Sequence, residues 1–292
     1  MVDLSRVNGN LPLPIYPKSN LKINRIIMFD ILYQNDHVLI VQTHAGKFDK
    51  WGDDLYGSFN VGLHVGDDSE QVLANRMALL DELNKLTNDK ISQIHWLNQI
   101  HSDIVAHASC AIPPQDADAL ITDRAGVGLS IMTADCVPIA LFNDDCADNE
   151  NGQIACIHAG WQGLTKGIIK NTYQKFTNKT NIKAVIGACI SHDNYEINKT
   201  LAHDIISQVS DKTLVALTVD GLYQNIITDK DDDKCLIDIV KLTKLQLSHL
   251  NITVINDTVP CSYANPKYYS YRQQTHAKKS ATGRMATVIV KL

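Results

Sequence analysis

The sequence predicts a single-domain mixed α+β fold built as a layered sandwich, and three observations support it. Apolar runs of strand length outnumber the helical patterns, and several follow one another directly. A purely alternating pattern would instead indicate a doubly wound βαβ fold. No linker, repeat or charge block divides the 292 residues. A chain of this mass buries about three-quarters of its unfolded surface, which is enough for one large core. We therefore expect one domain over residues 1–292, with residues 1–20 as an N-terminal extension.

The elements of the N-terminal half follow from local patterns. Two runs rich in Ile and Val flank the polar turn 34–36, which predicts a hairpin of strands at 26–33 and 38–43. Asp68 followed by Gln71 resembles a capping box, and apolar residues at helical spacing predict a helix that ends near Leu86. Further strands are predicted at 91–97, 119–122, 128–132, 137–142 and 153–157.

The C-terminal half continues with mixed elements. A helix at 164–176 is followed by a strand at 183–187, and two more helices are predicted at 201–209 and 236–250. The remaining strands are predicted at 252–255, 268–271 and 286–290.

Composition narrows the class of protein. The formal net charge is −5 and the pI is about 6.1, so the chain lacks the basic surface of a nucleic-acid-binding protein. No run approaches the roughly 18 apolar residues of a membrane span, and the first residues carry no apolar segment typical of a signal peptide. We expect a cytoplasmic protein with a small-molecule partner, no nucleic acid and no membrane.

The cysteines indicate a reducing compartment. Their number is odd, their spacings are wide, and no CxxC pair occurs, so neither a disulfide framework nor a zinc ribbon is expected. The seven are Cys110, Cys136, Cys146, Cys156, Cys189, Cys235 and Cys261.

Three polar residues stand at or just beyond the ends of predicted strands. His101 follows the strand 91–97, Cys136 follows 128–132, and His158 closes 153–157. Strand ends in layered folds collect at one edge, where sites are usually built. Two imidazoles and one thiolate, with water in a fourth position, are typical of a catalytic zinc.

Two alternatives remain open at this point. The wide spacings match no short ligand motif, and on spacing alone three separate structural residues are the favoured explanation. Cys136 could instead be the nucleophile of a thiol hydrolase, with His101 or His158 as its base. Asp135 could orient either histidine or cap a turn.

Candidate anion-binding groups lie elsewhere in the chain. The Gly-containing segment 158–163 joins a strand to a helix, and its N–H groups suit phosphate. His64 lies in a second Gly-punctuated segment, 60–68. Arg272 and Arg284 are candidate anion clamps, although a single arginine more often forms a surface ion pair.

Taken together, these strings resemble the laccase-domain family, also called multicopper polyphenol oxidase-like or YfiH-type proteins. The matches occur in family order from about residue 43 to the C-terminus. They are FNVGLHVGDD (59–68), NR (75–76), NQIHS (98–102), DADAL (116–120), TADCVP (133–138), HAGW (158–161), IGACI (186–190), YEI (195–197), SYR (270–272) and TGRMAT (282–287).

The resemblance implies a single-domain α/β/β/α fold and a zinc site whose ligands and catalytic residues are His101, Cys136 and His158. It also implies a purine nucleoside phosphorylase that cleaves adenosine, inosine and methylthioadenosine with phosphate, and an adenosine deaminase activity. Copper-dependent phenol oxidation, with Cu²⁺ in the site, and editing of a peptidoglycan precursor are further activities attributed to the family. We expect substrate contacts from Asn60, His64, Gln162 and Arg272, and we consider a homodimer.

Two departures from the family pattern concern arginines. His44 stands where the family usually has the Arg of a T-R-x-G-G segment, and Gln162 stands where an Arg usually follows HAGW. Lys47, Lys166 or Arg272 could substitute, but a lysine offers a point charge instead of a fork. We therefore expect weaker phosphate binding than in a member with both arginines.

Overall fold

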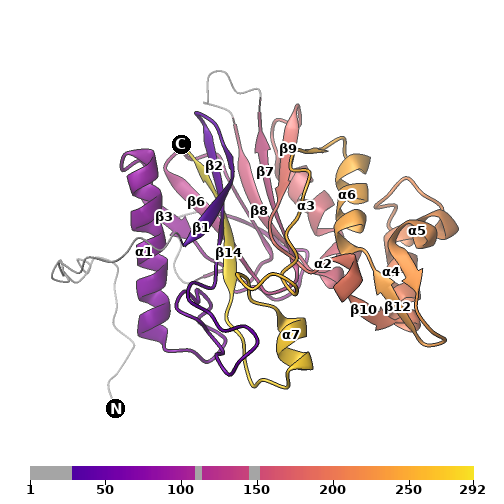
Figure 1. The fold of residues 1–292 in the computed structure, drawn as a ribbon. Coiled ribbons are helices and arrows are strands. Elements are labelled where there is room, and N and C mark those ends of the chain that lie inside the picture. The colour runs from indigo at the N-terminus through magenta and orange to yellow at the C-terminus, as the bar shows by residue number, and fades with distance from the viewer. Residues whose placement is uncertain (1–27, 109–113, 145–151) are drawn as a thin grey trace, which may run out of the picture.

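Two β-sheets stacked face to face form the centre of the protein, and helices cover the outer face of each sheet (Figure 1). The computed structural model describes residues 28–108, 114–144 and 152–292. The layers run helix, sheet, sheet, helix, which confirms the layered α+β sandwich that the sequence predicts.

The first sheet has five strands in the order β1-β2-β14-β6-β3. Their bounds are Phe29–Gln34 (β1), Val38–Thr43 (β2), Met285–Lys291 (β14), Val127–Thr133 (β6) and Gln93–His95 (β3). Neighbours are antiparallel except β3 and β6. The last strand of the chain therefore lies between one from its beginning and one from its middle.

The second sheet has six strands in the order β13-β9-β7-β8-β5-β4. Their bounds are Thr253–Val254 (β13), Ile182–Ile186 (β9), Val137–Asn143 (β7), Ile154–Ala159 (β8), Ala119–Thr122 (β5) and Val105–His107 (β4). A small third sheet at one end of the molecule joins Glu196–Asn198 (β10), Lys234–Ile237 (β12) and Ile227–Asp229 (β11).

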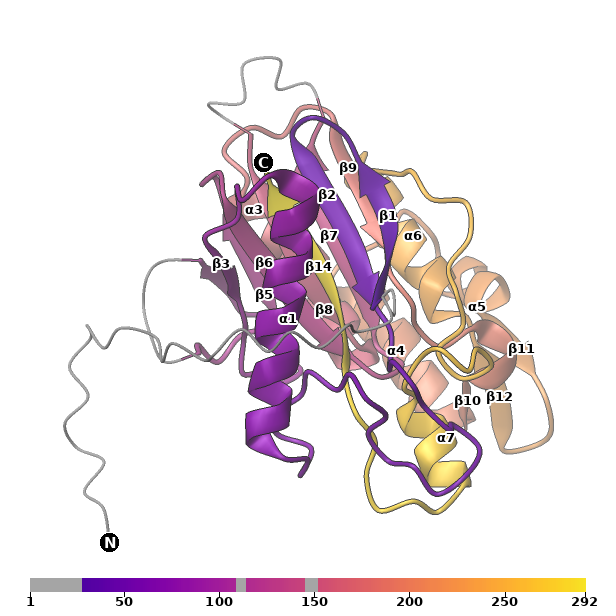
Figure 2. The same cartoon turned by 60° about the vertical axis from the view of Figure 1, so that its left-hand side comes forward.

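Helices cover the two outer faces (Figure 2). Among the described helices, α1 (Ser69–Thr87) packs on the first sheet, where Leu79 and Leu83 belong to a cluster that includes Val41 and Val288. On the second sheet lie α2, α3 and α6, while α4 and α5 pack against these helices and against the small third sheet. Their bounds are Trp161–Lys166 (α2), Ile168–Lys175 (α3), Lys199–Asp211 (α4), Val219–Ile226 (α5) and Ile239–His249 (α6), and the short α7 is Tyr271–His276.

The space between the sheets is filled by apolar side chains from both. Ile131 and Ile289 of the first sheet share one cluster with Ala140, Phe142 and Cys156 of the second. Strands β6, β7 and β8 are buried at every position because both of their faces are covered. This is why they read in the sequence as continuous apolar runs.

The start of α1 has one half of the capping box that the sequence predicts. The Asp68 side chain accepts hydrogen bonds from the N–H groups of Glu70 and Gln71, as an N-cap should. The Gln71 side chain donates to Asn75 instead of turning back to the Asp68 N–H, so the reciprocal half of the capping box is not formed.

Three predicted elements are wrong in detail. The helix expected at 164–176 is broken at Gly167 into α2 and α3. The first residues of the helix expected at 236–250 belong to strand β12. The strand expected at 268–271 is absent, because Tyr268 and Tyr269 are buried side chains of a loop that leads into α7.

Other predictions extend beyond the described ranges. The N-terminal extension 1–20, the first residues of the strand predicted at 26–33, Cys110 and Cys146 lie outside them. Among the described residues, no helix combines the length and the apolar character needed to cross a bilayer.

Candidate metal centre

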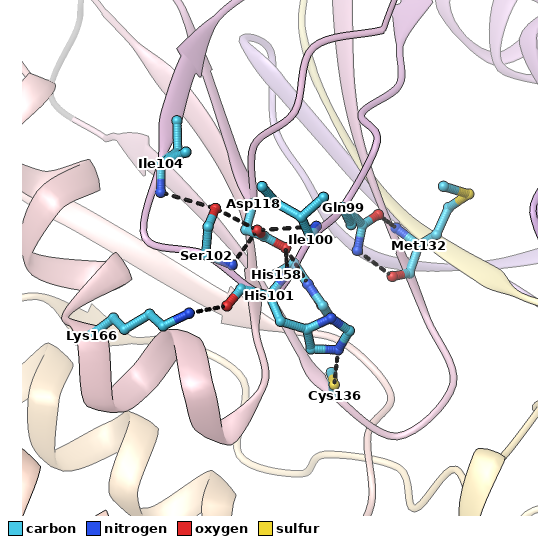
Figure 3. A network of polar contacts seen from close by, with 10 residues as sticks. All are labelled: Gln99, Ile100, His101, Ser102, Ile104, Asp118, Met132, Cys136, His158 and Lys166. Atoms are coloured by element: carbon cyan, nitrogen blue, oxygen red, sulfur yellow. Dashed lines mark hydrogen bonds and ion pairs between the residues drawn. The ribbon is translucent and has the colours of Figure 1, made fainter.

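His101, Cys136 and His158 converge at the edge where the two sheets meet (Figure 3). His101 lies on the connection from β3 to β4 and Cys136 on the connection from β6 to β7, so both sit where the chain crosses between the sheets. His158 is part of β8. One ligand atom from each residue lies within 4.8 Å of the other two. The structure thus places the three predicted ligands together.

The connections that hold the first two ligands carry unusual backbone conformations. His101 has φ 56° and Asp135, which precedes Cys136, has φ 105°. Residues with a Cβ adopt such angles only when their surroundings enforce them. At His101, the N–H donates to an Asp118 oxygen (3.1 Å) and the carbonyl accepts from Lys166 Nζ (2.8 Å).

Gly160 of the HAGW string makes room for the ligands. A Cβ atom at this position would lie 3.0 Å from Cys136 Sγ and 3.3 Å from His101 Cδ2. The string therefore supplies a ligand and the space beside it.

Asp118 is the centre of the polar network behind the ligands (Figure 3). Its fully buried carboxylate accepts hydrogen bonds from His158 Nδ1 (2.7 Å), from Ser102 Oγ (2.6 Å) and from the N–H groups of residues 100–102. Burial alone would raise the pKa of Asp118, but the hydrogen bonds from His158 and Ser102 lower it to about 2. The carboxylate is therefore ionised at neutral pH, and His158 Nδ1 carries the proton.

The proton on Nδ1 leaves His158 Nε2 as the atom that faces the site. Burial opposes the thiolate form of Cys136, but His158 and His101 lower the pKa of the thiol to about 6. Burial likewise opposes a charged His158, but the Cys136 thiolate and Asp118 raise the pKa of its imidazole. The site thus favours an ionised sulfur beside two imidazoles.

This donor set fits a metal ion. In a tetrahedral zinc site, an imidazole nitrogen and a thiolate sulfur lie about 3.6 Å apart, and here His101 Nε2 and Cys136 Sγ are 3.9 Å apart. The two imidazole rings meet edge to face, with centroids 4.7 Å apart. Three protein ligands leave a fourth position for water or substrate, as in catalytic sites.

A cavity of about 660 Å³ opens in front of the three ligands. Its volume is within the range of small-molecule sites. Its lining includes the apolar and aromatic residues Trp161, Ile190, Tyr195, Ile239 and Tyr271. The other polar or charged lining residues are His64, Gln99, Thr133, Asp135, Gln162, Arg272, Thr275 and Arg284.

Three of the four residues expected to contact substrate line this cavity, namely His64, Gln162 and Arg272. The Arg272 guanidinium lies over the Tyr195 ring, 5.3 Å from its centroid, and Nη1 donates to the Glu196 carbonyl (2.8 Å). Asn60, the fourth, is 1% exposed and lies outside the lining.

Asp135 does not orient a histidine. Its carboxylate accepts from Ser262 Oγ (2.6 Å) and from the Arg272 N–H (2.7 Å), which ties the Cys136 loop to the start of α7. Asp118 orients His158 instead. The sequence contains Asp118 in the string DADAL, but nothing in that string shows which donors it meets.

His44 and Gln162, which stand where the family usually has arginines, lie in different positions relative to the cavity. His44 lies 2.8 Å from an Asp30 oxygen and packs edge-on against Tyr268, away from the cavity lining. Gln162 lines the cavity. Lys166 is held by the His101 carbonyl, and neither it nor Lys47 is among the lining residues.

Gln99 is a lining residue that sequence reasoning missed. Its amide pairs with the main chain of Met132: Nε2 donates to the carbonyl and Oε1 accepts from the N–H, both at 2.8 Å (Figure 3). This pairing fastens the His101 connection to β6. The string NQIHS contains Gln99, but the partner is far away in the chain.

Comparison with known proteins gives one family. The family model described as "Multi-copper polyphenol oxidoreductase laccase" matches residues 37–291. A curated purine nucleoside phosphorylase of Corynebacterium glutamicum is 31% identical over 242 residues, covering 80% of this chain and 87% of that protein. The purine nucleoside phosphorylase YfiH of Escherichia coli K12 is 29% identical over 237 residues, with 80% and 86% covered.

Solved structures share the fold. The Neisseria meningitidis protein NMB0706 has a TM-score of 0.69 and 26% sequence identity, covering 90% of this chain and 99% of that one. YlmD from Geobacillus stearothermophilus has a TM-score of 0.66 at 21% identity, again over 90% and 99%.

Proposed function

This chain belongs to the multi-copper polyphenol oxidoreductase laccase family, and on that premise we propose that it is a zinc-dependent purine nucleoside phosphorylase. The observation that carries the proposal is the single cavity in which the His101, Cys136 and His158 ligand atoms face an aromatic wall and two arginines. The names of the curated relatives support it. The substrates we propose are adenosine, inosine and methylthioadenosine.

In this reaction an oxygen of phosphate forms a bond to C1′ of the ribose while the C1′–N9 bond breaks. The electron pair of the broken bond passes to the purine, which takes up a proton and leaves as the free base. The other product is ribose 1-phosphate from adenosine or inosine, and 5-methylthioribose 1-phosphate from methylthioadenosine. The protein must therefore hold an anion and a purine side by side, and it must stabilise the departing base.

The residues of the cavity suit these tasks. Trp161, Tyr195 and Tyr271 offer faces on which a purine can stack. Arg272 adds positive charge at the same wall. A bound zinc would act as a Lewis acid on an oxygen or nitrogen in the fourth position. Asp118 keeps the His158 proton on Nδ1, so that Nε2 stays available as a ligand.

We include adenosine deaminase activity in the proposal. Water would replace the 6-amino group of adenosine, which gives inosine and ammonia. A metal site with one open position is also the usual setting of zinc deaminases.

One observation favours a second candidate. The Cys136 thiol lies beside the His158 imidazole, which in turn bonds the buried Asp118 carboxylate. This chain of contacts is the arrangement of a cysteine hydrolase. Such an enzyme would cleave a peptide or amide bond, as in the editing of a cell-wall precursor. Copper-dependent phenol oxidation ranks lower, because one three-ligand group is found among the described residues and a multicopper cluster needs more.

Product analysis separates these candidates. We expect purified protein to convert inosine to hypoxanthine and ribose 1-phosphate only when phosphate is present, and to convert adenosine to inosine without it. Near-stoichiometric zinc that is lost in Cys136→Ser would identify a ligand. Zinc-replete protein whose Cys136 is alkylated rapidly, with no nucleoside product, would favour the hydrolase.

A further inference from the structure

Two arginines line the cavity, and they are held very differently. Arg272 lies on the Tyr195 ring and donates to the Glu196 carbonyl, so its guanidinium is fastened to the aromatic wall. Arg284 uses Nη1 alone, which donates to the carbonyls of Thr282 (3.0 Å) and Gly283 (3.1 Å). Within the described part of the chain, the Nε and Nη2 groups of Arg284 have no protein acceptor.

Arg284 also lacks a counterion. No carboxylate of residues 28–108, 114–144 or 152–292 forms an ion pair with it. Cys136 and Asp135 attract the Arg284 charge from a distance, but the Asp135 carboxylate already accepts hydrogen bonds from Ser262 and from the Arg272 N–H. Desolvation lowers the pKa of Arg284 by more than these acidic groups raise it, so the buried charge is only partly compensated.

The neighbours of Arg284 strengthen the positive potential. His64 lines the same cavity, and burial lowers the pKa of its imidazole, with a further contribution from the nearby charges of Arg284 and Arg76. Arg76 lies behind the wall, stacked 4.0 Å from the Trp96 centroid and bonded to the Val61 carbonyl. This end of the cavity is therefore lined by one guanidinium and by a neutral imidazole that can donate one N–H, with the second guanidinium behind the wall.

The stem of Arg284 is fixed in place by the segment 60–62. Asn60 Oδ1 accepts from the N–H groups of both Gly62 (2.9 Å) and Arg284 (2.8 Å), and the Val61 N–H donates to the Arg284 carbonyl (3.1 Å). A Cβ at Gly62 would lie 2.8 Å from Arg284 Cγ, so only glycine lets the side chain pass here. Asn75 in turn donates to the Asn60 carbonyl (2.8 Å).

We infer that Arg284 and His64 form the subsite for inorganic phosphate, with Asn60 and Gly62 as the residues that position Arg284. This rests on the proposed phosphorylase function and adds to it the place of the anion. A guanidinium with two free N–H groups suits bidentate contact with a tetrahedral oxyanion, and the His64 N–H supplies a third donor. The subsite opens onto the cavity that the three metal ligands share.

This subsite gives phosphate a charged partner although the two expected arginines are absent. His44 is paired with Asp30 outside the cavity, and Gln162 carries no charge. Arg284 belongs to the string TGRMAT that resembles the family, so it is an additional cation and not a replacement for the missing arginines. The Thr282 and Gly283 carbonyls already hold its guanidinium, so little side-chain entropy is lost when an anion binds.

The test compares Arg284→Gln and Arg284→Lys with wild type, using inorganic phosphate as the probe. Phosphate binding to the zinc-loaded protein, without nucleoside, is measured by calorimetry. We expect Arg284→Gln to weaken binding about tenfold or more and Arg284→Lys to weaken it less, because lysine keeps the charge but not the fork. Arg124→Gln makes the same chemical change on an exposed turn and should leave phosphate binding unchanged.

Kinetics give a second measurement. In Arg284→Gln the KM for phosphate should rise by a similar factor, while the KM for inosine changes less than about twofold. Phosphate binding or a phosphate KM equal to that of wild type in a folded Arg284→Gln would overturn the subsite, even if inosine is cleaved. Arg284-dependent phosphate binding without any inosine cleavage would support the subsite and refute the proposed phosphorylase.

Discussion

One buried carboxylate connects the two histidines of the candidate metal centre. Asp118 bonds the side chain of His158 and the backbone N–H of His101, so it fixes the tautomer of one ligand and the conformation of the other. The φ of 56° at His101 is maintained through this contact and through Lys166. Asp118 therefore orients the imidazole of His158 directly and fixes the backbone that carries His101.

Asp118→Asn should lower the affinity for zinc by about 10–100-fold, the usual effect of removing a partner behind a metal ligand. An amide offers one acceptor where the carboxylate offers two, and its NH₂ group would face donors. Zinc affinity is measured by competition with a chelator of known affinity. Asp116→Asn is the matched control, since Asp116 is exposed and contacts the Asn98 side chain.

Ser102→Ala is a second variant that tests the same network if Asp118→Asn does not fold. It removes one donor to Asp118 without touching either histidine, and a smaller loss of zinc affinity is expected. If both variants bind zinc as tightly as wild type, Asp118 does not organise the site.

Some residue roles could be predicted from the sequence and others could not. His101, Cys136 and His158 could be predicted because each stands at a strand end within a recognisable string. The roles of Asp118 and Asn60 could not, since both depend on which distant donors or acceptors the fold brings to them. Asn60, expected at the substrate, instead holds Arg284 from behind.

At the scale of elements, the break between α2 and α3 has a specific cause. Gly167 has φ 93° and serves as the C-cap of one helix and the N-cap of the next. Its N–H bonds to the carbonyls of Gly163 and Leu164, which ends α2. The apolar pattern on both sides is helical, so periodicity predicts one helix and cannot locate the turn between the two.

Gly167→Ala should destabilise the protein by about 1–2 kcal/mol, because a residue with a Cβ is strained at this φ. The added Cβ would also lie 3.3 Å from a Leu214 methyl group. The free energy of unfolding is measured by urea denaturation. Gly221→Ala, within α5 at an ordinary helical conformation, is the control. Its added Cβ would lie 3.1 Å from the Thr218 hydroxyl, but alanine favours the helix, so this variant should be less destabilised than Gly167→Ala. Equal effects at both positions would contradict this explanation.

The other wrong elements have tertiary causes. Residues 234–237 pair with β10 and β11, and this pairing overrides the helical pattern that continues into α6. Asp238 then caps α6 by accepting from the Lys241 N–H. Tyr268 and Tyr269 have the composition of a strand, but their rings anchor a loop whose carbonyls hold the buried ammonium of Lys50.

At the scale of the whole molecule, the layered class was predictable and the strand order was not. Consecutive apolar runs indicate sheets, and the family resemblance implies two of them with helices outside. No local pattern shows that β14 lies between β2 and β6, because its partners are far away in the chain. Thr287 Oγ1, for example, bonds the Gln42 side chain 245 residues earlier.

The prediction that the chain forms one cooperative domain can be tested. Three substitutions to alanine probe three different apolar clusters. They are Leu79→Ala on the buried face of α1, Leu129→Ala between the sheets and Leu242→Ala on the buried face of α6. Each should destabilise the protein by about 2–5 kcal/mol and shift the same unfolding transition. The transition is followed by both circular dichroism and tryptophan fluorescence. Two separate transitions, each sensitive to different variants, would show more than one domain.

Because His101 and Cys136 lie on connections between the two sheets, a bound metal would also have a structural role. Each ligand sits where the chain passes from one sheet to the other, and the third sits within the second sheet. An ion bound by all three would stabilise the folded chain, because the unfolded chain does not hold the three ligands together and would lose the ion. The same ion would connect the two sheets along their shared edge. Loss of the metal would then weaken the contact between the two sheets as well as inactivate the site.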